Sequence, residues 1–348
     1  MCLFLSNVKK TSKSAILLIS QVVSSFLFIM SFERHENLLA EIATLYFRQK
    51  MTQVEIASII GYSRSAVSRL LTEAEQRGIV EINIKFPIER LSNLENQIKT
   101  KFGIENVFVV KRGTTPSQTL VQVGQLGAWF AENLLRENGI VGISWGTGVF
   151  EVVNAFSPKP INNLKVVQII GSTGGKSDPN VDGPVLARHL ANKFNATYFI
   201  LPAPLVVGSS SIRDLLLSER DIQSTLQLAY QADFALVGVG SVEPIASSSF
   251  LRSGYLTQEE ILEVNALGGT GNICGTIYDK NGKVLNIDIN HRLVAIDLLK
   301  LCASSCKIIG VAVGEHKVPS ILGALKGKLI DILVTDSSAA EMVIATDD

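Results

Sequence analysis

The chain has 348 residues, 47% of them apolar, which predicts a globular protein of two or three domains with a sizeable core. Its 32 basic residues equal its 32 acidic residues, which excludes nucleic-acid binding through bulk charge, so any DNA contact must come from local placement. Only Cys302 and Cys306 are close in sequence, and no histidine lies at metal-ligand spacing beside them, which argues against structural zinc. A disulfide framework is not expected either, so we expect a reducing, cytoplasmic location. We expect no metal and no cofactor.

Residues 1–30 differ in character from the rest of the chain. Lys9 and Lys10 precede the apolar run AILLISQVVSSFLFIM, which is shorter than the roughly 20 residues that a membrane span needs. The run has the basic-then-apolar order of a signal peptide, but no clear small-x-small cleavage site follows it. Met30 then begins MSFERHENLLAEIATLYF, a natural start for a helical domain. We therefore expect an extension, either a start-codon artefact or a real anchor or tail. Because DNA binding argues against export, we expect no membrane partner.

Residues 31–86 predict two short helices joined by a tight turn. Thr52 and Glu55 have the spacing of a capping box, and an apolar helical face follows them. That face comprises Val54, Ile56, Ala57, Ile59 and Ile60. Gly61 ends the helix, and Ser63 is a good N-cap for a second helix that directs Val67, Leu70 and Leu71 inward. These spacings are those of a helix-turn-helix, and RGIVEINIKF after them alternates like a short strand or wing.

The outward face of the second helix is suited to DNA, because arginine and serine reach phosphates and base edges. It has no acidic residue before Glu73. With Thr52 at the start of the first helix, the candidate DNA-binding residues are Thr52, Ser63, Arg64, Ser65, Ser68 and Arg69. The alternative is a plain αα-hairpin with a solvated polar face. Because the spacing, cap, turn and acid-free face agree, we expect operator DNA as a partner.

Residues 87–348 predict a doubly wound, Rossmann-like α/β domain. After Pro87 come an amphipathic helix and a strand, and then continuous apolar strands alternate with helices. Strands are expected at 140–144, 165–170, 196–201, 234–240, 307–314 and 331–336. Helices are expected at 119–135, 185–194, 212–231 and 319–327. A hairpin over 273–290 is expected to turn at Asn281-Gly282.

Polar, glycine-rich loops follow these strands, and parallel sheets bind ligands beyond the carboxyl ends of their strands. The loop SWGTG opens a helix and exposes backbone N–H groups to an anion, and Lys317 adds a full positive charge. The candidate effector-binding residues are Gly146, Thr147, Gly148, Gly171, Ser172, Gly240, Glu243, Asp288, Arg292, Lys317 and Asp336. Asn272 is a further candidate partner for sugar hydroxyls, as are Glu243, Asp288 and Arg292. Several such loops at one sheet edge predict a pocket for a polar small molecule.

From about residue 35 to the C-terminus, the chain resembles the SorC family of bacterial sugar-binding transcriptional regulators. The matching segments are MTQVEIASIIGYSRSAVSRLLTEAEQRGIVEI, VGISWGTGV, LVGVGSVEP, SFLRSGYL, GNICGTIYD and VAVGEHKVPSILGALKGKLIDILVTDSSAA. The resemblance implies an N-terminal helix-turn-helix and a C-terminal domain like glucosamine-6-phosphate and ribose-5-phosphate isomerases, with a sugar or phosphorylated sugar as effector. It places Gly146, Thr147 and Gly148 on a phosphate-cradling loop and Lys317 at a basic ligand position.

Three residues depart from the family pattern. Gly148 stands where many members have a second Thr or Ser, so the phosphate loop lacks one hydroxyl. Asn272 stands where Asp is common, and His291 stands where many members have Asp. These departures leave the identity of the sugar open.

The combined features predict a transcriptional regulator whose operator affinity is controlled by the effector. A near-palindromic operator requires two recognition helices, so we expect the chain to associate with itself as a dimer or tetramer. The alternative is a sugar-phosphate isomerase or deaminase fused to a DNA-binding module, with Asp178, Asp182, Glu243 and His189 as candidate acid or base groups. Because GVGSVEP lacks the Asp-Gly-His continuation of the deaminases, we expect no catalytic residue and no enzyme.

Overall fold

The structure is a computed structural model that describes residues 35–80, 87–174, 178–244, 250 and 254–346. By its internal contacts, the chain divides into two compact units, Met1–Ile84 and Lys85–Asp348. The predicted extension over 1–30 and most of the predicted wing, 81–86, lie outside the described residues. Within the described ranges, no helix has both the length and the apolar content that crossing a bilayer requires.

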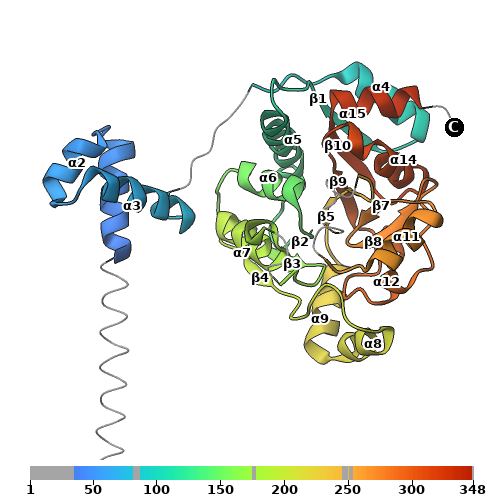
Figure 1. The fold of residues 1–348 in the computed structure, drawn as a ribbon. Helices are drawn as coiled ribbons and strands as arrows, with labels where there is room; N and C mark the ends of the chain where they lie inside the picture. The colour runs from blue at the N-terminus through green and yellow to red at the C-terminus, as the bar shows by residue number, and fades with distance from the viewer. Residues whose placement is uncertain (1–34, 81–86, 175–177, 245–249, 251–253, 347–348) are drawn as a thin grey trace, which may run out of the picture. The chain divides into compact units, whose positions relative to one another are not determined.

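The described part of the first unit is helical (Figure 1). A helix over 35–43 runs on into a π turn, η1 (Thr44–Arg48), and α2 (Gln53–Ile60) and α3 (Arg64–Gln76) follow. The predicted capping box of Thr52 and Glu55 is confirmed, as are the helix end at Gly61, with φ of 72°, and the N-cap at Ser63. The core of this unit comprises Leu39, Ile42, Ile56, Val67, Leu71 and Ala74.

The apolar face of α2 is narrower than predicted. Ile56 and Ala57 are buried, but Val54 and Ile59 are exposed by 61% and 62%. Residues on a helix advance by about 100° each, so Val54 and Ile59 lie roughly a quarter-turn or more from the centre of the buried stripe. The sequence of α2 therefore predicted more buried residues than the packing of this short helix against α3 provides.

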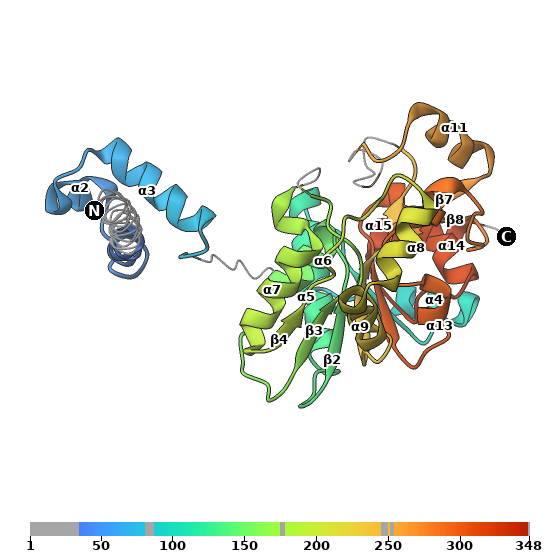
Figure 2. The same cartoon turned by 90° about the horizontal axis from the view of Figure 1, so that it is seen from below.

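The second unit is built on a seven-stranded parallel sheet in the order β1-β10-β9-β5-β2-β3-β4 (Figures 1 and 2). Its strands are β1 (Asn106–Val110), β2 (Ile140–Ile143), β3 (Lys165–Gln168), β4 (Thr197–Phe199), β5 (Phe234–Gly238), β9 (Lys307–Val311) and β10 (Ile332–Asp336). From β2 the chain moves outward to β3 and β4, returns to β5 beside β2, and continues to β9 and β10. The strand order therefore reverses between β2 and β5, where doubly wound sheets bind their ligands.

Helices cover both faces of this sheet, so the predicted doubly wound α/β fold is confirmed (Figure 2). One face packs against α5 (Pro116–Ala131), α6 (Thr147–Ala155) and α7 (Gly183–Phe194). The other packs against α4 (Ser92–Phe102), α9 (Arg220–Ala229), α13 (Leu298–Cys302), α14 (Val318–Lys326) and α15 (Ser337–Ala345). Because alternate residues of each strand are buried against opposite helix layers, the strands read as continuous apolar runs.

A small antiparallel sheet joins β6 (Gly240–Ser241), β7 (Gly269–Ile273) and β8 (Thr276–Asp279). The β7–β8 hairpin turns at Cys274 and Gly275, with φ of 52° and 79°, not at Asn281-Gly282 as predicted. The predicted turn exists, with Asp279 N–H donating to Lys283 O at 3.0 Å, but it is followed by one isolated bridge rather than by a strand.

The remaining elements show one further difference from the sequence prediction. The helical stretch expected over 212–231 is divided into α8 (Ser210–Ser218) and α9, because the backbone of Glu219 between them is extended. The other short elements are η2 (Pro179–Val181), α11 (Gln258–Ala266), α12 (Asp288–His291) and η4 (Glu315–Lys317).

Candidate functional site

The exposed face of α3 brings four of the predicted DNA-binding residues together. Arg64, Ser65, Ser68 and Arg69 are exposed, and neither arginine has an ion pair with a carboxylate in the described part of the chain. The first acidic residue of the helix, Glu73, lies in its second half and is paired with other side chains. It pairs with Arg77 at 2.6 Å and accepts a hydrogen bond from His35 at 2.9 Å, which is the main cause that lowers the pKa of Glu73. The start of α3 is thus free to present positive charge.

Thr52 and Ser63, the other two candidates, are engaged in helix caps. The Thr52 hydroxyl donates to Glu55 Oε2 at 2.8 Å and accepts from Glu55 N–H at 3.3 Å. The Ser63 hydroxyl accepts from Ala66 N–H at 3.2 Å. Both hydroxyls therefore fix the starts of their helices.

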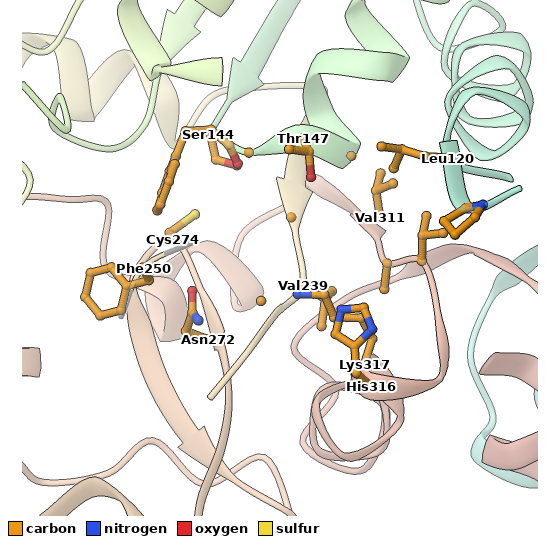
Figure 3. Close-up of a pocket in the computed structure, with 18 residues that line it drawn as sticks. Leu120, Ser144, Thr147, Val239, Phe250, Asn272, Cys274, Val311, His316 and Lys317 are labelled. Carbon is orange, nitrogen blue, oxygen red and sulfur yellow. The ribbon is translucent and has the colours of Figure 1, made fainter. Parts of the chain in front are cut away.

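In the second unit, a cavity of about 270 Å³ lies beyond the carboxyl ends of β2, β5 and β9, at the switch point of the sheet (Figure 3). Its polar side chains are Ser144, Thr147, Asn272, His316 and Lys317. Its larger apolar side chains are Leu120, Trp145, Val239, Phe250, Val311 and Val313. None of the described residues that line the cavity is an aspartate or a glutamate. Figure 3 shows Thr147, Asn272 and Lys317 directed into the cavity from different elements.

The N-terminus of α6 forms one wall of the cavity. Gly146 precedes the helix with φ of 119°, a conformation that side chains disfavour, and it provides no side-chain cap. Its own N–H donates to Val181 O at 3.1 Å. The N–H groups of Thr147, Gly148 and Val149 have no partner among the described hydrogen bonds. Since helix N-termini carry partial positive charge, this wall favours an anion.

Lys317 contributes the only lysine or arginine side chain to the described lining of the cavity. Its Nζ donates to the Ser241 hydroxyl at 3.3 Å, and it forms no ion pair within the described ranges. Burial lowers the pKa of Lys317 to about 8. Burial, and then the charge of Lys317, lowers the pKa of His316. An anion in the cavity would stabilise the protonated amine of Lys317.

Asn272 faces the cavity from β7 and is only 6% exposed. No described hydrogen bond uses its side-chain amide. Asn272 reaches this place because its neighbour is a glycine: a β-carbon on Gly240 would lie 2.5 Å from Asn272 Nδ2. A buried, unpaired amide offers both a donor and an acceptor, which matches a sugar hydroxyl.

Five predicted effector-binding residues line this cavity: Gly146, Thr147, Gly148, Gly240 and Lys317. Gly171, Ser172 and Glu243 do not. A β-carbon on Gly171 would lie 2.6 Å from Pro204 O, so this glycine permits a close backbone approach. The Ser172 hydroxyl donates to Asp182 at 2.6 Å, and Glu243 accepts from Asn265 at 3.0 Å. Each residue thus has a partner within its own part of the fold.

Asp288, Arg292 and Asp336 also lie outside the cavity lining. Arg292 pairs with Asp288 at 2.6 Å and with Glu260. Asp336 accepts the Gly314 N–H at 2.6 Å and the Ser338 N–H at 3.0 Å, which caps α15. These three polar residues therefore serve ion pairs and a helix cap.

Sequence reasoning missed several residues of the cavity. His316 follows the predicted strand 307–314 and precedes Lys317, so its position could have indicated it. Val311 ends β9 but lies inside the longer predicted strand, so its position predicts a core residue. Leu120 lies in the second turn of α5, and Phe250 lies in the family-like segment SFLRSGYL but far from any strand end, so no strand-end signal marked either one.

Comparison with known proteins identifies both units. Residues 86–345 match the family model described as "Putative sugar-binding domain", and residues 23–96 match the Crp-like helix-turn-helix domain. The chain is 31% identical over 310 residues to the sorbitol operon regulator of Klebsiella pneumoniae, covering 88% of this chain and 98% of that protein. It is 30% identical over 312 residues to the deoxyribonucleoside regulator of Bacillus subtilis, covering 89% and 97%.

Solved structures agree with these matches. The crystal structure of the full-length sorbitol operon regulator SorC from Klebsiella pneumoniae superposes with a TM-score of 0.69, at 31% identity and over 88% of this chain and 98% of that one. A probable sor operon regulator from Shigella flexneri gives 0.66 at 29% identity, over 73% and 98%. These relatives are transcriptional regulators rather than enzymes. The chain belongs to the SorC family of sugar-binding transcriptional regulators.

Proposed function

We propose that this regulator binds a phosphorylated sugar in the cavity at the β2–β5 switch point, and that this effector changes the affinity of α3 for operator DNA. The observation that carries the proposal is the Lys317 ammonium, which faces a cavity without a described carboxylate. A neutral sugar would leave this charge without a counter-charge. A phosphate placed between Lys317 and the free N–H groups of α6 would be bound by both.

The rest of the cavity suits the carbon skeleton and hydroxyls of a small sugar. Asn272 and Ser144 supply hydrogen-bonding groups, and Trp145 and Phe250 supply apolar surface. The sorbitol and deoxyribonucleoside regulators bear names that point to polyhydroxylated carbon sources and sugar-containing compounds. We infer the same chemical class of effector for this chain.

The DNA half of the proposal rests on the exposed start of α3. In a helix-turn-helix, the N-terminal residues of the second helix contact base edges, so Arg64, Ser65, Ser68 and Arg69 would enter the major groove. An operator with two half-sites requires two copies of this helix, so the regulator would act as a dimer or tetramer. A regulator of this kind would work in the cytoplasm, where the DNA lies.

Calorimetric titration with matched pairs of compounds tests the effector. Each phosphorylated pentose, deoxypentose or hexose is compared with its unphosphorylated parent, in the wild type and in Lys317→Met. We expect binding of a phosphorylated compound and a loss of about tenfold or more in Lys317→Met, since a buried charge-assisted contact contributes roughly 1.5–3 kcal/mol. Equal binding of the parent sugar would disprove the phosphate requirement but retain the sugar site. Absence of binding across all pairs would disprove the effector class.

A further inference from the structure

Helix α5 touches both the cavity and the segment that leads toward the DNA-binding unit. Pro116 and Leu120, in its first two turns, line the cavity. Farther along, α5 contacts residues 87–91, here called the entry segment, which is the first described part of the second unit. In sequence, only residues 81–86 separate the entry segment from the described end of the first unit.

Helices α5 and α6 lie side by side (Figures 1 and 2), and they are in close contact. A β-carbon on Gly124 would lie 2.5 Å from Glu151 Cβ, and one on Gly127 would lie 2.8 Å from Val152 Cγ2. Because interiors are close-packed, a displacement of α6 must be followed by α5. Both helices begin at the cavity, so an anion at the N-terminus of α6 acts on this helix pair.

The first contact between α5 and the entry segment is a part-buried hydrogen bond. Gln122 Nε2 donates to Pro87 O at 2.8 Å, and the Gln122 side chain is only 7% exposed. Gln122 lies two residues beyond Leu120, which lines the cavity. A shift or rotation of α5 at the cavity therefore changes the position of the group that binds the Pro87 carbonyl.

The second contact is a stack of Arg90 on aromatic rings. The Arg90 guanidinium carbon lies 5.3 Å from the Trp129 ring centroid on α5 and 5.0 Å from that of Phe108 on β1. Its nitrogen atoms donate to both oxygens of Glu95 at 3.1 and 2.8 Å. The backbone is fixed as well, since Leu91 N–H donates to Val109 O at 3.0 Å. Arg90 thus binds the entry segment to α5 and to the sheet edge together.

We propose that α5 transmits effector binding to the entry segment, through the Gln122–Pro87 hydrogen bond and the Arg90–Trp129 stack. This inference rests on the proposed function, because it requires an effector in the cavity. Coupling between the two sites of a regulator is a free-energy difference, and a path is shown only when breaking it removes coupling but not binding. Gln122, Arg90 and Trp129 are positioning residues, because none of them lines the cavity.

The two tryptophans of the chain stand at the two ends of this path, which provides the test. Trp145 lines the cavity and Trp129 stacks with Arg90. In Trp129→Phe, tryptophan emission reports occupation of the cavity; in Trp145→Phe, it reports the entry segment. Each full-length variant is titrated to saturation with inorganic phosphate and with pentose, deoxypentose and hexose phosphates.

We expect the same probe to change both emissions. Adding Gln122→Leu should then remove the Trp129 response but leave the Trp145 response, which also shows that the cavity is folded. Arg90→Met is a second variant with the same expected result. The matched control is Gln168→Leu, which removes another buried glutamine, one whose Nε2 donates to Ile170 O at 2.6 Å, and it should leave both responses intact.

Two other results would overturn the inference, and they are distinguishable. If Trp145 responds while Trp129 is silent, or if Trp129 still responds in Gln122→Leu and Arg90→Met, α5 does not transmit binding and the proposed function stands. If neither tryptophan responds to any probe, the anionic effector itself is disproved, and the coupling path is disproved with it.

Discussion

A β-carbon on Gly148 would lie 2.9 Å from Cγ1 of Val311, so the second residue of α6 faces the end of β9 with no room for a side chain. In the sequence, Gly148 stands where many family members have a hydroxyl in the phosphate loop. The structure gives a steric reason, because Val311 occupies the space that a threonine or serine would need. The anion wall in this chain is therefore made of backbone N–H groups and the Thr147 hydroxyl.

The first prediction concerns this contact. Gly148→Ala should destabilise the fold by about 1 kcal/mol, because an overpacking cost of roughly 1–3 kcal/mol exceeds the helical gain of roughly 0.5–1 kcal/mol from glycine to alanine. In a Val311→Ala background, the same substitution should be neutral or stabilising. Chemical denaturation of the four chains measures this reversal of sign. Equal effects of Gly148→Ala in both backgrounds would show that Val311 does not limit the site.

The second prediction uses the amine of Lys317, whose pKa burial lowers from 10.5 to about 8. Between these values the unfolded chain holds a proton that the folded, ligand-free chain has lost, so this residue adds stability as pH rises from about 8. Below about pH 8 the buried Lys317 amine is protonated, so the full cost of removing its charge from water lowers the unfolding free energy. Lys317→Met should therefore raise the unfolding free energy of the ligand-free protein at pH 7, as measured by denaturant titration.

The same titration makes effector binding pH-dependent. An anion binds the protonated amine, so its affinity should fall as pH rises above about 8 in the wild type. A phosphate monoester has its second pKa near 6, so it is almost fully ionised at about pH 8 and adds no change of its own above that pH. Calorimetry at successive pH values checks this, with Lys317→Met as the control that should show no such fall. A flat affinity in the wild type would exclude Lys317 as the anion-binding group.

Most of the fold was predictable from sequence because its strands are buried on both sides. The runs 165–170 and 331–336 carry apolar residues in succession, Val166-Val167 and Ile332-Leu333-Val334, and they became β3 and β10 in a parallel sheet. The hairpin was misplaced because Asn281-Gly282 is a strong turn signal, whereas Cys274 is not a usual turn residue. It nevertheless adopts φ of 52° in the turn that joins β7 and β8.

The site was predictable only as far as strand ends can be read. Gly146, Thr147 and Lys317 follow strands and line the cavity. Asp336 also ends a strand, but it caps α15, because a carboxylate there satisfies helix N–H groups as readily as a ligand. Sequence alone cannot tell a helix-capping carboxylate from a ligand-binding one. The difference depends on whether a neighbouring loop or an open cavity lies beyond the end of the strand.

The third prediction assigns Thr52 to the capping box. Thr52→Ala should lower stability by about 1 kcal/mol, because the N–H of Glu55 loses its hydroxyl partner, while Thr52→Ser should retain most of it. Hydrogen exchange of the α2 amides in the full-length protein measures the effect locally. If Thr52→Ala instead weakens DNA binding and leaves α2 exchange unchanged, the hydroxyl contacts DNA.

The fourth prediction concerns the arginines of α3, with an operator duplex selected in vitro from random sequence. If Arg64 and Arg69 contact phosphates, replacing either with alanine should lessen the slope of log affinity against log salt by about 1. If one of them reads a base, its replacement should cost about 1–3 kcal/mol and relax specificity at one position. Effector binding should be unchanged in both variants.

Arg77→Ala is the matched control for this measurement. Arg77 lies beyond the last residue of α3 and pairs with Glu73 at 2.6 Å, so its charge is already compensated. Its replacement should leave the salt slope within error of the wild type. If all three variants kept the wild-type salt slope, the positive start of α3 would not face the DNA backbone. The reason is that counterion release follows the number of phosphates that a surface neutralises.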